Sequence, residues 1–257
     1  MSALKGKVAI VTGASTSKGI GSAIARRFAQ EGAALYLVAE GAREQLEAVR
    51  DGCRGYPECA GAQCALFDLG ERGAAESMVA DAQKRMGRID ILVNNAGIRE
   101  SHKFGEYTRD VFERVVAVNL AAPFFAAQAL VPIMRAQGGG RIINIASQLG
   151  HVTYAKRALY GLTKAALIHL TMSMAYELAS DGIIVNSISP GPIRTQFIID
   201  RAAEEPEEAA LRLKTYLPAG RLGEPEEIAD LALFLASTPA TYLQGEDICI
   251  DGGYTSH

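Results

Sequence analysis

The sequence predicts a single doubly wound α/β domain over residues 1–257, in which a parallel sheet of about seven strands carries helices on both faces. First, short apolar runs alternate with segments of helical spacing along the whole chain. Second, most of these runs are continuously apolar, as expected of parallel strands buried on both faces. Third, 257 residues, of which 49% are hydrophobic, suffice for one sizeable core.

The first half of the chain supplies four of the predicted strands. KVAIVT is mostly apolar and ends at Gly13, and the next segment places Ile20, Ile24 and Phe28 on one helical face before Gly32. A later stretch rich in Cys, Gly and Pro predicts an irregular connection. The elements are, in order, strand 7–12, helix 19–30, strand 34–39, helix 43–49, strand 64–69, helix 73–86 and strand 89–97.

The second half continues the alternation. Pro123 and Pro132 predict a bend and an end in a long helix, and three glycines at 138–140 predict a turn into the next strand. The elements are, in order, helix 112–134, strand 141–146, helix 158–180, strand 183–189, helix 225–236 and strand 247–250.

Composition and charge exclude several functions. A net charge of −3 without an Arg-rich run argues against a nucleic-acid partner. The N-terminus lacks the pattern of a signal peptide and no apolar run approaches a membrane span, which predicts a cytoplasmic protein with no membrane contact. Cys53, Cys59 and Cys64 are separated by five and four residues without a histidine, so no metal is expected.

Three side chains between residues 147 and 164 suit acid–base chemistry. Tyr160 and Lys164 stand four residues apart at the start of a helical run, so both side chains project from one face. A nearby positive charge favours phenolate and makes tyrosine a proton-transfer group. Ser147 follows the apolar strand RIINIA and adds a hydroxyl. This arrangement suits polarising and protonating a carbonyl.

The first strand, glycine-rich turn and helix predict a nucleotide site. Gly19 and Gly21 open the helix, whose amides and positive dipole end favour a pyrophosphate. Asp68 ends a strand and is a candidate for the adenine amine, although it also suits a helix N-terminus. Glu40 follows a strand and suits ribose hydroxyls, whereas Lys18 in the turn suits a 2′-phosphate.

With these residues in place, the chain resembles a short-chain dehydrogenase/reductase along its whole length. The family's motifs occur in order: Thr12-Gly13 before Gly19-Ile20-Gly21, Asp68, Asn94-Asn95-Ala96-Gly97, Asn119, Ser147, Tyr160-x-x-x-Lys164 and Pro190-Gly191. The resemblance implies a Rossmann fold and an NAD(P)-dependent oxidoreductase that interconverts a secondary alcohol and a ketone by hydride transfer.

The resemblance also implies roles for single residues. Tyr160 is expected to be the general acid in reduction and the base in oxidation, and Ser147 to hydrogen-bond the carbonyl oxygen. Lys164 is expected to lower the pKa of Tyr160 and to hold the nicotinamide ribose, and Asn119 to hold a water that links Lys164 to solvent. The expected cofactor contacts are Gly13, Ser15, Lys18, Gly19, Ile20, Gly21, Glu40, Asp68, Leu69, Asn95, Ala96, Gly97, Tyr160, Lys164, Pro190, Gly191, Ile193 and Thr195.

The chain departs from the family pattern in one place. Five residues, 14–18, separate Gly13 from Gly19, where the family usually has three, so Lys18 does not simply inherit a phosphate-binding role. Glu40 therefore slightly favours NAD(H) over NADP(H) as the predicted cofactor. The long turn is similar to that of enoyl-thioester reductases, but those have six residues between Tyr and Lys, and the corresponding position 157 here is Arg. Carbonyl chemistry is therefore favoured.

Substrate contacts are expected from Gln148, Tyr154, Arg99 and Arg157, which suggest an acidic or polar substrate such as a sugar acid or a 3-oxoacyl thioester. Solvated loop charge is the plainer interpretation of these cations. Residues 196–217 are expected to form a mobile lid, and the family resemblance implies a homotetramer. The rival hypotheses are a catalytically silent dinucleotide-binding regulator or scaffold and, less favoured, an isomerase or dehydratase on the same fold.

Overall fold

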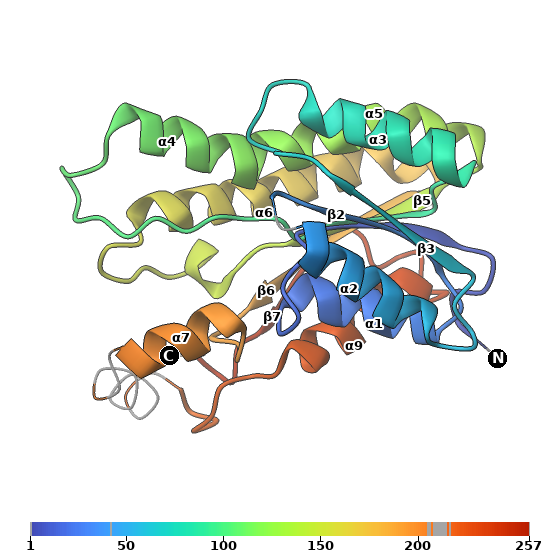
Figure 1. Cartoon of the computed structure of the whole chain (residues 1–257). Helices are drawn as coiled ribbons and strands as arrows, with labels where there is room; N and C mark the ends of the chain where they lie inside the picture. The colour runs from blue at the N-terminus through green and yellow to red at the C-terminus, as the bar shows by residue number, and fades with distance from the viewer. Residues whose placement is uncertain (1, 42, 205–206, 208–214, 216, 257) are drawn as a thin grey trace.

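Seven strands form one parallel sheet in the order β3-β2-β1-β4-β5-β6-β7, as predicted from the continuous apolar runs (Figure 1). The computed structural model describes residues 2–41, 43–204, 207, 215 and 217–256. The strand order reverses between β1 and β4, and ligands of such sheets bind beyond the carboxyl ends at this point. The strands are β1 Val8–Thr12, β2 Ala34–Ala39, β3 Gly61–Leu66, β4 Ile91–Asn94, β5 Gly140–Ile145, β6 Ile183–Pro190 and β7 Asp247–Ile250.

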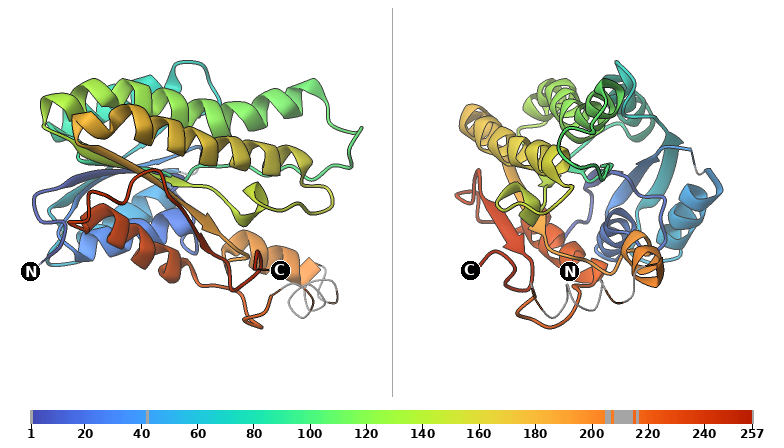
Figure 2. Two further views of the ribbon diagram at one scale, coloured as in Figure 1. Left: turned by 180° about the vertical axis from the view of Figure 1, so that it is seen from behind. Right: turned by 90° about the vertical axis from the view of Figure 1, so that its left-hand side faces the viewer.

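Helices cover both faces of the sheet, as Figures 1 and 2 show. On one face lie α1 Ile20–Gln30, α2 Arg43–Arg54 and α9 Pro225–Ser237. On the other lie α3 Ala74–Met86, α4 Arg109–Val116, α5 Ala122–Ala136 and α6 Ala158–Leu178, with the short helices η1 Ala117–Ala121, η2 Gln148–Gly150 and η3 Ala179–Asp181 beside them. Helix α7 Gln196–Glu204 lies at the end of the molecule toward which the carboxyl ends of the strands point.

Strand β2 shows why the apolar runs are continuous. Leu35 and Leu37 belong to the core under α1, α2 and α9, whereas Tyr36 and Val38 belong to the core under α3 and α5. All four side chains are fully buried. Because successive side chains of a strand point to opposite faces, a strand covered on both sides needs an apolar residue at every position.

The connection between β2 and β3 differs from the prediction. Helix α2 continues to Arg54 instead of ending at residue 49, because Leu46, Val49 and Cys53 extend one buried face at helical spacing. Strand β3 covers Gly61–Leu66, three residues before the predicted range, because it pairs with all six residues of β2. The boundaries are set by strand pairing, which the local sequence does not encode.

The long helix on the second face also departs from the prediction. It begins after Thr108, whose hydroxyl accepts a hydrogen bond from the Val111 amide at 3.2 Å, and it continues beyond Pro132 to Ala136. A π-helical turn, η1, precedes Pro123, which sits in the first turn of α5 where its missing N–H is tolerated. The predicted bend is therefore a π turn around Asn119.

This helix, Arg109–Ala136, is the one described segment long and apolar enough to cross a membrane, with a mean hydropathy of 1.7 in its most apolar window. The expectation that no run approaches such a span was therefore wrong on length and composition alone. Here 39% of that window is buried, and Val115, Ala126, Leu130 and Met134 are buried side chains of the helix. Length and apolarity alone are weak evidence of a membrane span, because the core helix of a globular domain has the same character.

Candidate active site

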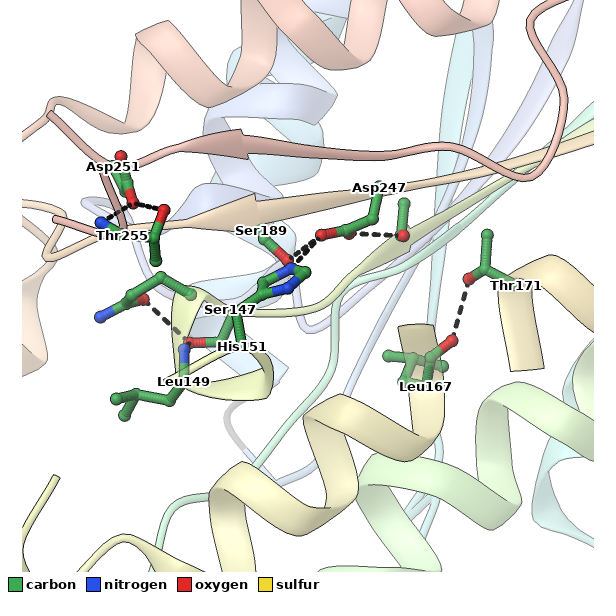
Figure 3. A network of polar contacts seen from close by, with 11 residues as sticks. Ser147, Leu149, His151, Leu167, Thr171, Ser189, Asp247, Asp251 and Thr255 are labelled. Carbon is green, nitrogen blue, oxygen red and sulfur yellow. Dashed lines mark hydrogen bonds and ion pairs between the residues drawn. The ribbon is translucent and has the colours of Figure 1, made fainter. Parts of the chain in front are cut away.

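Ser147 lies directly beyond β5 at the carboxyl edge of the sheet. Its backbone is extended and caps η2, and its hydroxyl accepts a hydrogen bond from the Leu149 amide at 3.2 Å (Figure 3). The hydroxyl also donates to the Gln148 side-chain oxygen at 3.0 Å and shares a hydrogen bond with the side chain of Tyr160. Ser147 is 6% exposed, so these contacts fix its hydroxyl beside the phenol.

Tyr160 occupies the first turn of α6, where the charges of two arginines act on its phenol. Burial raises the pKa of Tyr160, whereas the positive charges of Arg99 and Arg157 and the hydrogen bond with Ser147 act in the opposite direction. The sequence pattern assigned that electrostatic role to Lys164. In the structure the charges that act on the phenol belong to Arg99 and Arg157, which precede the helical run.

Lys164 lies one turn further along α6, and its ammonium lies over the Tyr160 ring. Its Nζ donates to the Ile145 carbonyl at 2.7 Å and lies 5.7 Å from the centroid of the Tyr160 ring. The side chain is 3% exposed, and burial lowers the pKa of Lys164 to about 8. The Ile145 carbonyl thus holds the ammonium beside the Tyr160 ring, on the helix face that i,i+4 spacing predicted.

Asn119 is fully buried in the π turn. Its side-chain amide donates to the Ile98 carbonyl at 2.9 Å and to the Thr163 hydroxyl at 3.1 Å, and its oxygen accepts from the Ile98 amide at 2.8 Å. A Cβ on Gly97 would lie 3.4 Å from the Asn119 oxygen and 3.5 Å from Lys164 Nζ. Asn119 thus fixes the 97–98 backbone beside Lys164.

The glycine-rich turn packs against the end of β4. A Cβ on Gly21 would lie 2.5 Å from both the Gly13 carbonyl and the Asn95 side-chain nitrogen, so only glycine fits there. Asn95 donates to the carbonyls of Thr12 and Gly13 at 2.8 and 3.1 Å, and the Thr12 hydroxyl accepts from the amides of Asn95 and Ala96 at 3.0 Å each. Asn95 and Ala96 therefore shape the turn through contacts with Thr12, the first residue of the Thr12-Gly13 motif.

The enlarged turn is held from α1. The Ser22 hydroxyl donates to the carbonyls of Thr16 and Gly19 at 2.5 and 3.0 Å, and Arg26 donates to the Ser17 carbonyl at 2.9 Å. Lys18 is exposed, and its carbonyl accepts from the Gln196 amide at the start of α7 at 3.0 Å. Helix α1 begins at Ile20 with its positive dipole end directed at this turn. A small-residue cradle opening a helix fits a dinucleotide pyrophosphate, with Ser15, Gly19 and Ile20 on its rim.

The two acids expected at the adenosine end are joined by Arg114 of α4. Its guanidinium donates to Asp68 Oδ1 at 2.7 Å and to both oxygens of Glu40 at 2.9 and 3.0 Å. Leu69, next to Asp68, lines a small cavity with Thr12 and other residues. An arginine within a helical run carries no sequence signal of such a contact, so Arg114 was not among the predicted residues.

The segment after β6 closes the other side of the site. Pro190 ends β6, and a Cβ on Gly191 would lie 2.5 Å from the Asp251 backbone. Ile193 is 5% exposed and bridges to Gly223, and the Thr195 carbonyl accepts hydrogen bonds from backbone amides in the first turn of α7. The remainder of the predicted lid, 205–206, 208–214 and 216, lies outside the described residues.

Three of the predicted substrate residues, Arg99, Gln148 and Arg157, interact with Ser147 or Tyr160. Arg99 stacks on Phe197 of α7, with 4.3 Å between its Cζ and the ring centroid. Arg157 is 4% exposed and donates to the Ser101 hydroxyl and to the Lys156 carbonyl. Gln148 is buried against Ser147, and Tyr154 is half-buried in the segment between η2 and α6.

Comparisons with known proteins place this chain in a family. A family model described as "Enoyl-(Acyl carrier protein) reductase" matches residues 13–255. The uncharacterized oxidoreductase YxbG of Bacillus subtilis is 38% identical over 264 residues, covering 100% of this chain and 94% of that protein. A short-chain type dehydrogenase/reductase from Mycobacterium marinum superimposes with a TM-score of 0.90 at 37% identity, covering 99% of this chain and 97% of that one. The chain belongs to the short-chain dehydrogenase/reductase family.

A further structural relative carries ligands at its site. L-Sorbose reductase from Gluconobacter frateurii, complexed with NADPH and L-sorbose, superimposes with a TM-score of 0.93 at 32% identity, with full coverage of both chains. As a short-chain dehydrogenase/reductase, the present protein is an oxidoreductase that acts on CH–OH groups and uses NAD(H) or NADP(H). The enzyme class expected from the sequence is confirmed.

In this short-chain dehydrogenase/reductase, a polar contact ties the segment after Ser147 to the edge strand. His151 reaches Asp247 on β7 at 2.6 Å, beside Ser189, which donates to the same carboxylate at 2.7 Å (Figure 3). His151, Asp247 and Cys249 offer ligand atoms within 4.8 Å of one another. The His–Asp separation is shorter than the roughly 3.3 Å between two ligands of tetrahedral zinc, so this pair is a hydrogen bond rather than part of a metal site.

Proposed function

We propose that the protein interconverts a secondary alcohol and a ketone, with Tyr160 as the general acid in reduction and the general base in oxidation. The observation that carries this is the placement of Ser147 at the carboxyl edge of the sheet and of Lys164 Nζ 5.7 Å from the centroid of the Tyr160 ring. Because burial raises the pKa of Tyr160, the phenol is protonated at neutral pH and suits proton donation to a carbonyl. Ser147 would donate to the carbonyl oxygen as negative charge develops.

The remaining machinery serves the dinucleotide, which supplies or accepts the hydride when bound. Lys164 would hold the nicotinamide ribose hydroxyls, and the glycines of the 13–21 turn would receive the pyrophosphate. Since the Asn119 side chain is already bonded to Ile98 and Thr163, a water linked to Lys164 would rest on the Asn119 main-chain carbonyl. The π turn departs from the regular i→i−4 hydrogen-bond ladder at this residue.

The substrate we propose carries an acidic group, as a sugar acid or a 3-oxoacyl thioester does. Arg99 and Arg157 both act electrostatically on Tyr160, so a carboxylate or phosphate attached near the reacting carbon would lie between them. A relative from Thermotoga maritima, 36% identical over 250 residues, is named 3-oxoacyl-[acyl-carrier-protein] reductase. Gln148 and Tyr154 would line this pocket, and Phe197 would bring α7 against it.

The first experiment compares Tyr160→Phe with the wild type. We expect turnover to fall by about 10²–10⁴-fold while the Kd for NADPH, measured by calorimetry, stays within threefold. Retained turnover in Tyr160→Phe would exclude Tyr160 as the proton donor. Cofactor binding without turnover by the wild type, on a panel of sugars, sugar acids and 3-oxoacyl thioesters, would favour the rival hypothesis of a silent regulator.

A second experiment tests the acidic substrate. Arg99→Ala and Arg157→Gln should each raise KM for an acidic substrate by at least tenfold and leave a neutral analogue of the same length nearly unchanged. An equal effect on both substrates would show that the arginines only support the fold. Arg99→Lys keeps the charge and serves as the conservative control.

The cofactor, assembly and cellular location complete the proposal. The slight preference for NAD(H) deduced from Glu40 loses its basis, because Arg114 engages both carboxylate oxygens of Glu40 and the sorbose reductase named above holds NADPH. We propose a cytoplasmic homotetramer of single-domain subunits spanning residues 1–257. Exposed Phe124, Phe125 and Tyr176 on α5 and α6 support burial of that face by a second copy.

A further inference from the structure

Arg114 connects two elements of the sheet that the sequence treats separately. Glu40 follows β2 and Asp68 follows β3. Arg114 belongs to α4, on the face of the sheet that also carries α3 and α5. The guanidinium lies 2.7 Å from Asp68 and 2.9 Å from Glu40 at its nearest oxygens. One fork-shaped cation therefore spans both acids expected to meet the adenosine.

The backbone at Gly70 makes room for the contact between Arg114 and Asp68. A Cβ on Gly70 would lie 1.8 Å from Arg114 Nη1, so the absence of a side chain at residue 70 is what admits the guanidinium. The Gly70 amide also donates to Asp68 Oδ1 at 2.8 Å. Hydrogen bonds from Arg114 and Gly70 outweigh burial and hold the pKa of Asp68 below its usual range. Asp68 and Arg114 are therefore both charged at neutral pH.

The charge balance of this corner depends on Arg114. Two carboxylates alone would repel the extra phosphate that distinguishes NADP(H) from NAD(H). Arg114 offsets one of these charges and offers planar donors that match phosphate oxygens. Two other cations belong to neighbouring segments of the chain and are exposed: Arg43 lies 3.6 Å from Glu47, and Lys18 lies in the 14–18 turn.

We propose that Arg114 is the residue that lets this enzyme accept a 2′-phosphate, by neutralising Glu40 in the free protein and by binding the phosphate in place of Glu40. The inference rests on the proposed function only in requiring a dinucleotide at this edge of the sheet. NADP(H) would release Glu40 toward solvent, where it is already 56% exposed, while Asp68 keeps its hydrogen bond to Arg114.

The test is calorimetric titration of the wild type, Arg114→Ala, Glu40→Gln and Arg109→Ala with NADPH and with NADH at fixed salt. Arg109 is the matched control, since it removes one positive charge from the same helix at a side chain that is 84% exposed. We expect Arg114→Ala to raise the Kd for NADPH at least tenfold and that for NADH less than threefold. Arg109→Ala should change neither by more than twofold.

Glu40→Gln keeps Arg114 and tests the same idea from the other partner, and it decides the matter should Arg114→Ala fail to fold. We expect Glu40→Gln to lower the Kd for NADPH at least threefold relative to the Kd for NADH. Equal weakening of both cofactors by Arg114→Ala, or an unchanged NADPH/NADH ratio in Glu40→Gln, would overturn the inference and leave the proposed function intact. Binding of neither cofactor by the wild type would overturn the proposed function itself.

Discussion

Lys164 should destabilise the free enzyme at neutral pH, and Lys164→Met should therefore unfold at a higher temperature while losing activity. The ammonium is 3% exposed and has one carbonyl partner, that of Ile145. Burial lowers its pKa to about 8 from an ordinary value of 10.5. Below pH 8 the folded and unfolded states both carry the charge, so the folded state bears the full cost of burying it.

The magnitude follows from the pKa difference. One pKa unit corresponds to 1.36 kcal/mol, so the lowered pKa of Lys164 corresponds to about 3 kcal/mol of lost folding stability at pH 7. Methionine keeps the apolar stem but leaves the Ile145 carbonyl without its donor, which costs about 1 kcal/mol. The net gain of about 2 kcal/mol should raise Tm by about 4–8 °C in a chain of this size.

The pH dependence separates this effect from a packing effect. Above pH 8 the folded wild type releases its proton while the unfolded chain still binds one, so wild-type stability rises with pH until about 10.5. Urea unfolding without cofactor should therefore show the advantage of Lys164→Met falling from about 2 kcal/mol at pH 7 to near zero at pH 9.5. Lys84→Met, on the exposed part of α3, is the control for loss of a lysine. A variant that is less stable than the wild type at pH 7, or an advantage independent of pH, would refute the reasoning.

Three further predictions follow from the contacts of the site. Thr12→Val should lower the free energy of unfolding in urea by about 2–4 kcal/mol, because the hydroxyl accepts hydrogen bonds from the amides of residues 95–96. Thr12→Ser keeps a hydroxyl and should retain most of this stability. Gly21→Ala should weaken dinucleotide binding at least tenfold in calorimetry, since its Cβ would meet the Asn95 side chain at 2.5 Å. Phe197→Ala should raise KM several-fold at unchanged kcat by freeing Arg99; an effect on kcat alone would contradict a positioning role.

The fold was accessible from the sequence because its signals are local. Continuous apolar runs identified every strand, and helical spacing identified the helices that cover them. The predicted boundaries of α2 and β3 were wrong. Pairing with all six residues of β2 sets where β3 begins and ends, and burial of Cys53 extends α2 beyond residue 49. Both effects depend on a neighbouring element rather than on the segment itself.

Candidate residues were equally accessible where a motif is contiguous, as in the glycine turn or the spacing of Tyr160 and Lys164. The sequence by itself thus determined the fold class, the faces of the core and the edge of the sheet where chemistry collects. Only the tertiary structure decided that Arg114 joins Glu40 and Asp68, and that Arg99 and Arg157 face the phenol. Long charged side chains reach across packed elements, and their partners depend on how helices dock on the sheet, which no local periodicity specifies.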